Sequence, residues 1–195
     1  MKDKETKIKD LEKQVCELES SVDSLAQYSR RNSLHILGVP EKEHESPVEV
    51  ALELINKQWL DHSALDRVNR VGRIKDGTSR QLLVKFATYR ERHRVYRAKK
   101  TLKSNNSNRI FVNEDLTRRR SSLLYKARQL KKTKHIMDCW SYDGQILIKV
   151  SHGEVIPINS PLELDRLSIS PLIIELKRTS NASNVHGDLL TLNLI

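Results

Sequence analysis

Positively charged side chains are concentrated in the middle of this 195-residue chain, where they could bind phosphate groups. Residues 67–134 contain 22 Lys and Arg against 4 Asp and Glu, which gives this segment a net charge of +18. The whole chain carries +10, so the residues outside the segment sum to −8. Lys and Arg donate charge-assisted hydrogen bonds to phosphate oxygens, and such clustering is typical of a surface that binds a polyanion. The pattern therefore predicts binding of nucleic acid through its phosphates.

Two helices are expected to carry most of this charge. Residues 90–103 place Val95, Ala98 and Leu102 at helical spacing, with seven Lys and Arg on the other faces. A second basic helix is expected over residues 116–132. Both could be ordinary solvated helix faces, but the acidic residues that would form i,i+4 pairs are few. Three arginines at 118–120 would also lie in the first helical turn, where the helix dipole disfavours cations by ~0.3–1 kcal/mol each. We therefore favour a phosphate partner that neutralises them.

The elements around these helices are expected in a β-α-β-β-α-β order. Short apolar runs predict strands over residues 34–40, 66–72, 81–86 and 109–112. Ser46, Pro47 and Glu49 form a capping-box pattern that starts a helix between the first two strands, with Val48, Leu52, Ile55 and Trp59 on one face. This order is the split β-α-β arrangement of RNA-recognition domains.

A second, smaller unit is expected after the second basic helix. Asp143-Gly144 is a strong hairpin-turn signal between apolar runs at 137–142 and 145–150. Residues 153–158 add a third strand, and residues 161–167 a short helix.

The N-terminal residues 3–30 repeat apolar side chains every three and four positions, without Gly or Pro. The repeat places β-branched residues at heptad positions a and Leu at positions d, which are Ile8, Val15, Val22 and Leu11, Leu18, Leu25 respectively. A single amphipathic helix packed on the following domain would be the alternative, but the strict seam favours a coiled coil that joins several copies of the chain. β-branched residues at positions a with Leu at positions d nominally favour a parallel coiled coil of two helices.

The predicted fold class is α+β. We expect a coiled-coil helix at residues 3–30 and an atypical RNA-recognition-like domain at 32–113. A small α+β C-terminal domain that binds nucleic acid follows at 114–167, and a weakly structured tail at 168–195.

Enzymatic, metal-binding and membrane signals are weak. No Walker-type loop, Gly-x-Ser-x-Gly or His-Glu-x-x-His sequence occurs, so we expect no enzyme and no cofactor. His135 and Cys139 lack a second ligand pair, so we expect no metal site. No apolar run is long enough to span a membrane, and the first ten residues do not resemble a secretory signal. Cys16 and Cys139 are the only cysteines, which fits a reducing compartment better than a disulfide framework.

Several motifs in order resemble one known family. Residues 28–41, YSRRNSLHILGVPE, resemble the junction between coiled coil and RNA-recognition domain in the first-open-reading-frame protein of LINE (non-LTR) retrotransposons. The likeness continues through RVNRVG at 67–72, LLVKF at 82–86, YRAKK at 96–100 and NEDLT at 113–117. It covers roughly residues 5–165 and is closer to invertebrate-type elements than to the mammalian one.

The resemblance implies a parallel trimeric coiled coil, with self-association as a dimer as the other option. It implies single-stranded RNA and DNA as partners, bound largely without sequence preference, and a nucleic-acid chaperone that coats the element's RNA in a ribonucleoprotein supporting retrotransposition. The family's trimer signature is matched by Lys7-Ile8-Lys9-Asp10-Leu11-Glu12, with Lys in place of Arg. The location implied is a cytoplasmic ribonucleoprotein, with the nucleus as a second compartment.

The basic pair of the family's RNA-recognition domain corresponds to Arg97 and Lys100, and the arginines opening its next helix to residues 118–120. The strand at 80–86 lacks the paired aromatic residues that usually stack on bases, and His35 is either a stacking residue or an ordinary strand residue. We therefore expect phosphate contacts with a strong dependence on salt. The expected nucleic-acid-binding residues are His35, Arg70, Lys85, Arg94, Arg97, Lys100, Arg109, Arg118, Arg119, Arg120, Arg128 and Lys131.

Two alternative interpretations stay open. The chain could be a coiled-coil scaffold whose basic surface binds an acidic protein partner. It could also be a degenerate copy of such an element that folds without supporting transposition.

Overall fold

The computed structural model of the chain describes residues 2–55, 62–73, 77–99 and 110–169. The chain divides into two compact units, residues 1–119 and residues 120–195. Each unit contains helices and an antiparallel sheet, so the predicted α+β class is confirmed. Trp59, Lys100 and Arg109 lie outside the described residues, as does the predicted tail from residue 170 onward.

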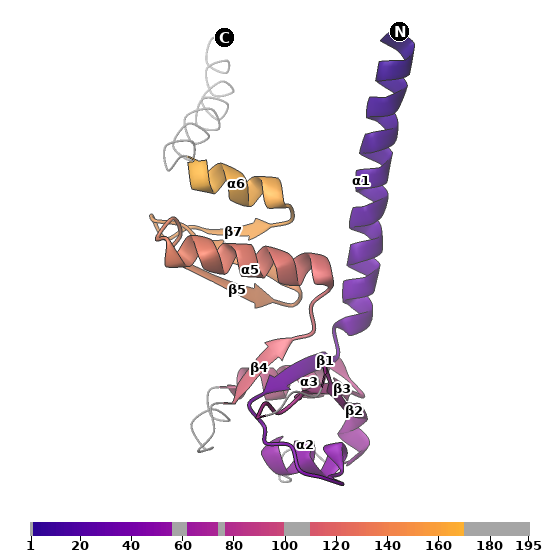
Figure 1. Cartoon of the computed structure of the whole chain (residues 1–195), viewed down its shortest axis with the longest axis vertical. Helices are drawn as coiled ribbons and strands as arrows, with labels where there is room; N and C mark the ends of the chain where they lie inside the picture. The colour runs from indigo at the N-terminus through magenta and orange to yellow at the C-terminus, as the bar shows by residue number, and fades with distance from the viewer. Residues whose placement is uncertain (1, 56–61, 74–76, 100–109, 170–195) are drawn as a thin grey trace, which may run out of the picture. The chain divides into compact units, whose positions relative to one another are not determined.

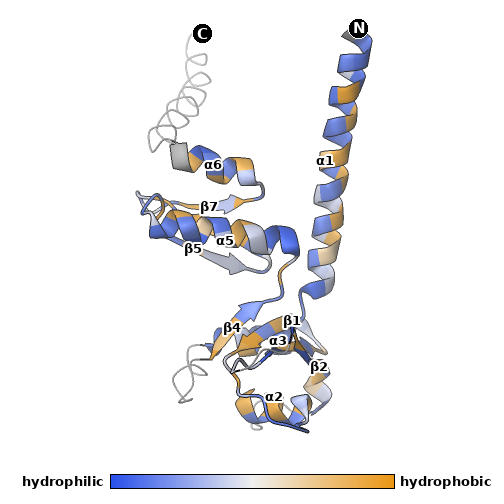
Figure 2. Cartoon of the chain, viewed as in Figure 1, coloured by the Kyte–Doolittle hydropathy of each residue, from blue (hydrophilic) through white to orange (hydrophobic). Residues whose placement is uncertain are grey.

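The first unit begins with one long helix, α1 (Lys2–Arg30) (Figure 1). Its six seam residues, from Ile8 to Leu25, are all 50–71% exposed. Hydrophobic and hydrophilic residues alternate along the helix (Figure 2). The single chain therefore leaves the predicted a/d seam uncovered.

A four-stranded sheet follows α1. It consists of β1 (Ser33–Leu37), β2 (Leu65–Val71), β3 (Gln81–Phe86) and β4 (Phe111–Glu114). The strand order is β2-β3-β1-β4, and each neighbouring pair is antiparallel. Two helices, α2 (Pro47–Ile55) and α3 (Tyr89–Arg97), and a 3-10 turn at His62–Ala64 connect the strands. The predicted β-α-β-β-α-β sequence of elements is therefore present.

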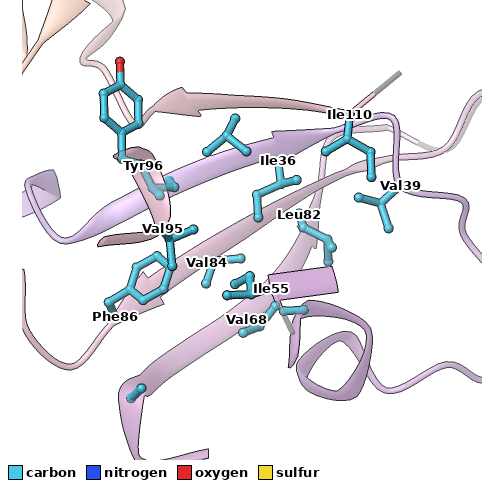
Figure 3. Packing of buried hydrophobic residues seen from close by; sticks show 14 residues of the cluster. Ile36, Val39, Ile55, Val68, Leu82, Val84, Phe86, Val95, Tyr96 and Ile110 are labelled. Atoms are coloured by element: carbon cyan, nitrogen blue, oxygen red, sulfur yellow. The ribbon is translucent and has the colours of Figure 1, made fainter. Parts of the chain in front are cut away.

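One face of this sheet forms the core of the first unit. Leu34 pairs with Val84 and Ile36 with Leu82 across β1 and β3, and directly paired residues of antiparallel strands point to the same side. Ile55 of α2 and Val95 of α3 pack into the same cluster (Figure 3). All six side chains are at most 1% exposed, and burial of each contributes about 1.5–3 kcal/mol. The opposite side of the sheet, which we call the open face, carries the alternating residues of each strand.

Helix α3 is shorter than predicted. Thr88 caps its N-terminus in a capping box with Glu91, and Ala98 forms its C-cap after Arg97. The prediction extended this helix to Lys103, and residues 100–103 lie outside the described part of the chain.

The end of α1 is tied to the segment between β4 and the next helix. The Gln27 side chain is buried, donates to the carbonyl of Asp115 (2.9 Å) and accepts from the Thr117 N–H (2.9 Å). The Thr117 hydroxyl donates to Asp23, and Arg30 donates to the Asp115 carboxylate at 2.9 Å. We call these five residues the clasp.

The clasp uses a face of α1 that the seam does not use. In the heptad that places Val22 at a and Leu25 at d, Asp23 and Arg30 occupy b positions and Gln27 an f position. Positions b and f point away from the a/d seam of a coiled coil. The contact between α1 and the segment after β4 therefore leaves the seam residues exposed.

The second unit is a three-stranded sheet with two helices. Helix α5 (Arg118–Lys132) starts just before the boundary between the units. It precedes β5 (Asp138–Tyr142), β6 (Gln145–Lys149), β7 (Val155–Ile158) and α6 (Pro161–Ile169). Asp143 and Gly144 both have positive φ, 53° and 79°, as a two-residue type I′ hairpin turn requires. Buried side chains of this unit include Leu123, Ala127, Ile146, Ile148, Ile158 and Leu164.

Candidate nucleic-acid interface

Three arginines form an exposed row on α3. Arg90, Arg94 and Arg97 are separated by four and three residues, so they lie on one face of the helix, and all three are exposed. Arg94 and Arg97 were predicted to contact nucleic acid, and Arg90 extends the row by one turn. This row can reach successive phosphates of a single strand.

Arg92 is the exception among the arginines of α3. Its guanidinium and the Glu114 carboxylate of β4 form an ion pair in which both side chains are at most 3% exposed. The guanidinium also lies 4.8 Å from the centre of the Tyr96 ring. Arg92 therefore joins α3 to the sheet and is removed from the surface charge that the sequence suggested.

The open face of the four-stranded sheet carries His35, Lys85 and two residues that the prediction missed. Arg67 pairs with Lys85 across β2 and β3, and Phe111 pairs with Leu37 across β4 and β1. Arg67 and Phe111 are exposed, and alternation between the buried Ile110 and Val112 was the signal that Phe111 points outward. The open face thus combines two cations with one exposed aromatic ring.

His35 and Lys85 both have acidic neighbours. His35 Nε2 lies 3.2 Å from the Asp115 carboxylate of the clasp, and its side chain is 22% exposed. Lys85 Nζ lies 2.6 Å from Asp66, with both side chains about half exposed. His35 is thus oriented by the clasp, and a phosphate that approaches Lys85 would compete with Asp66.

Burial raises the pKa of the Asp115 carboxyl, but the hydrogen bond from His35 and the Arg30 charge lower it more, so its net pKa lies below the ordinary value. The carboxylate thus remains charged at neutral pH and holds both partners.

The Arg70 side chain is buried within the fold, whereas a phosphate ligand would face solvent. Its side chain is 4% exposed and bonds Glu45 at 2.7 Å. It also donates to the carbonyls of Val39, Pro40 and Arg80. These hydrogen bonds join β2 to the loop after β1, so the geometry replaces the predicted phosphate contact of Arg70 with a role in the fold.

Helix α5 carries the arginines that the sequence placed in its first turn. It begins at Arg118, and its first turn contains no acidic residue. Arg118 and Arg128 are exposed, whereas Arg119 and Arg120 are partly buried. Arg120 donates to the carbonyl of Gly144 at 3.1 Å, so part of its guanidinium supports the hairpin turn. Of the four predicted arginines on α5, Arg118 and Arg128 are the most accessible.

An exposed tyrosine lies on the same face of α5 as these cations. Tyr125 is 64% exposed, and Arg118, Arg128 and Lys132 lie seven residues before it, three after it and seven after it. These spacings bring all four residues to one side of the helix. The prediction missed Tyr125 and Lys132, although the helical spacing in the sequence would have found them.

Lys131 is held by an ion pair at the start of β5. Its ammonium lies 2.6 Å from the Asp138 carboxylate, and both side chains are about half exposed. This hydrogen bond raises the pKa of Lys131 and lowers that of Asp138. Lys131 can contact a phosphate if the phosphate replaces Asp138 as the partner of the Lys131 ammonium.

Among the described residues, no group of three or more His, Cys, Asp or Glu side chains could hold a metal ion. None of the described helices is long and apolar enough to cross a membrane. Burial raises the pKa of the Cys139 thiol, so it is held in its protonated form.

No protein-family model matches this chain. No curated protein matches it either.

Proposed function

We propose that this chain is an oligomeric protein that binds single-stranded RNA or DNA through phosphate contacts and acts as a nucleic-acid chaperone. The observation that carries the proposal is the exposed row of Arg90, Arg94 and Arg97. These residues lie in the segment of net charge +18, and no acidic residue occurs from 116 to 137 on the second basic helix. Self-repelling cations on exposed helix faces are stabilised when a polyanion neutralises them.

The arrangement of the first sheet supports an RNA-recognition-like domain. The strand order β2-β3-β1-β4, with antiparallel neighbours and the β-α-β-β-α-β sequence of elements, supports the split β-α-β arrangement. The open face carries Phe111 but lacks a pair of aromatic residues on its two central strands. Binding would therefore depend on phosphates more than on base stacking at this sheet, with weak sequence preference.

The exposed seam of α1 supports self-association through a parallel coiled coil. A trimer is the state implied by the resemblance to LINE first-open-reading-frame proteins, and a dimer is the other candidate. Linking several basic domains raises the effective concentration of each weak contact for the next. Rapid exchange among such contacts would let strands anneal and rearrange. We propose that the element's own RNA is coated in this way in a cytoplasmic ribonucleoprotein.

The test is the binding of labelled single-stranded RNA by fluorescence anisotropy over a salt series. Each lost phosphate contact makes the negative slope of log K against log salt shallower by ~0.7, so Arg94→Gln with Arg97→Gln should make it shallower by about 1.4. The matched control, Lys9→Gln with Arg166→Gln, removes the same charge from exposed helix positions outside the row and should leave the slope within error. Equal effects of both pairs would show that only net charge matters. Absence of binding at low salt would refute the proposal and favour an acidic protein partner.

A further inference from the structure

The sheet of the second unit has one buried face and one outer face that is partly exposed. Ile146 pairs with Ile158 and Ile148 with Ile156, and these side chains point inward because Ile146, Ile148 and Ile158 are buried. Alternate residues of each strand point to the other side. This outer face carries Asp138, Trp140 and Tyr142 of β5, Gln145, Leu147 and Lys149 of β6, and Val155 and Pro157 of β7.

The outer residues differ in exposure, and Trp140, Leu147 and Lys149 in the middle of the face are partly buried. Tyr142 and Val155 are about half exposed, at 52% and 47%, and Pro157 is exposed. Trp140 lies directly opposite Leu147, which lies opposite Pro157, so an apolar row crosses all three strands. The outer face therefore combines an apolar, aromatic row with the oppositely charged residues Asp138 and Lys149 beside it.

The composition of the second unit indicates which kind of partner would fit this face. Residues 120–137 of the same unit contain six Lys and Arg and no Asp or Glu, and they lead directly into β5. Trp140 and Tyr142 are two residues apart on an edge strand, so their side chains emerge ~7 Å apart on one face. A partner must supply both negative charge and flat apolar groups. A nucleotide carries both, a phosphate and a base with two π faces.

We propose that the outer face of the β5-β6-β7 sheet, through Trp140 and Tyr142, stacks unpaired bases of single-stranded nucleic acid. This inference rests on the proposed function and adds a contact to bases where the basic helices contact phosphates. Stacking on these rings tolerates every base, because each base presents a π face. Leu147 lies directly opposite Trp140 on the neighbouring strand. Lys149 lies opposite Asp138, so an adjacent phosphate would compete with that carboxylate for the Lys149 ammonium.

The experiment compares an oligothymidylate with an abasic strand of equal length, which keeps the phosphates and lacks the bases. Trp140→Ala with Tyr142→Ala should weaken oligothymidylate binding by about 5- to 100-fold for each stacked base lost. It should leave abasic-strand binding and the salt slope unchanged. Trp140→Phe with Tyr142→Phe keeps the rings and should retain most of the affinity.

A second measurement does not depend on the folding of an alanine variant. The chain has two tryptophans, so Trp59→Phe leaves Trp140 as the single tryptophan, which can be excited at wavelengths where the tyrosines do not absorb. Oligothymidylate should quench its emission, and the abasic strand should not.

Equal affinity of the unaltered protein for both strands would overturn the stacking proposal and leave phosphate binding intact. Loss of binding to both strands in the alanine variant would also overturn it. An unquenched Trp140, together with altered self-association or melting of the alanine variant, would show that protein covers this face. Failure of the unaltered protein to bind either strand would refute the proposed function itself.

Discussion

Replacing Gln27 should release the clasp, because this one side chain satisfies two backbone groups. Gln27→Met keeps the length of the side chain and removes both of its hydrogen bonds, which measure 2.9 Å each. The Thr117 N–H and the Asp115 carbonyl then lose their partner beside a buried side chain. Each buried backbone group left unsatisfied costs about 1–3 kcal/mol, and the end of α1 can partly detach to admit water. We therefore expect a loss of about 2–4 kcal/mol in the free energy of unfolding.

Urea unfolding followed by circular dichroism measures this loss, and amide hydrogen exchange at Thr117 reports whether the clasp has opened. Ser24→Met is the matched control, because it places the same side chain at an exposed position in the same part of α1. It should change the stability by less than about 0.5 kcal/mol. A Gln27→Met protein that is as stable as this control, with unchanged exchange at Thr117, would refute the reasoning.

Three further predictions follow from ion pairs. Glu114→Ala should cost about 3–5 kcal/mol in urea unfolding, because it leaves the Arg92 guanidinium buried without its carboxylate, and Arg92→Met with Glu114→Leu should cost less. Because the pKa of Asp115 is lowered on folding, its stabilisation is complete above the ordinary value of 3.8 and is lost as the pH falls through the lowered pKa. The melting temperatures of the unaltered protein and Asp115→Asn should therefore differ at pH 7 and converge in strong acid. Asp138→Asn should free Lys131 and tighten RNA binding by about 1.5- to 5-fold in low-salt anisotropy, whereas an unchanged or weaker affinity would contradict a role for Lys131.

The order and type of the elements could be predicted from the sequence because they depend on local patterns. The Asp143-Gly144 turn, the alternation in β3 and the spacing of Val95 with its neighbours are all contained within a few residues. The helix after β1 begins at Pro47, as the capping pattern predicts, and α5 begins at Arg118. Several boundaries differ: β1 ends at Leu37 where the prediction reached residue 40, and α5 begins two residues after the predicted start at 116. Helix α3 ends at Arg97, and α6 continues to Ile169. The 3-10 turn at His62–Ala64 was not predicted.

The partners of individual side chains could not be predicted, because they come from distant parts of the chain. Glu45 is 25 residues from Arg70, and Asp115 is 80 residues from His35. A charge count treats Arg70, Arg92 and Arg94 alike, although two of them are buried in ion pairs and one is exposed. Which cations remain available to a ligand is decided by tertiary contacts and not by composition.

The clasp and the a/d seam lie at a fixed angle to each other around the axis of α1. A residue of an α-helix turns the chain by about 100°, so one residue inserted between Leu25 and Gln27 would swing the clasp toward the seam. In the proposed coiled coil, the domain of each copy would then collide with the neighbouring helix, or the helices would have to separate along the seam. Whole heptads added or removed before Ile8 would leave this angle unchanged. The length of the proposed coil is thus free to vary. The two helical turns that join it to the sheet must keep one angle between the clasp and the seam, because only that angle allows assembly and folding together.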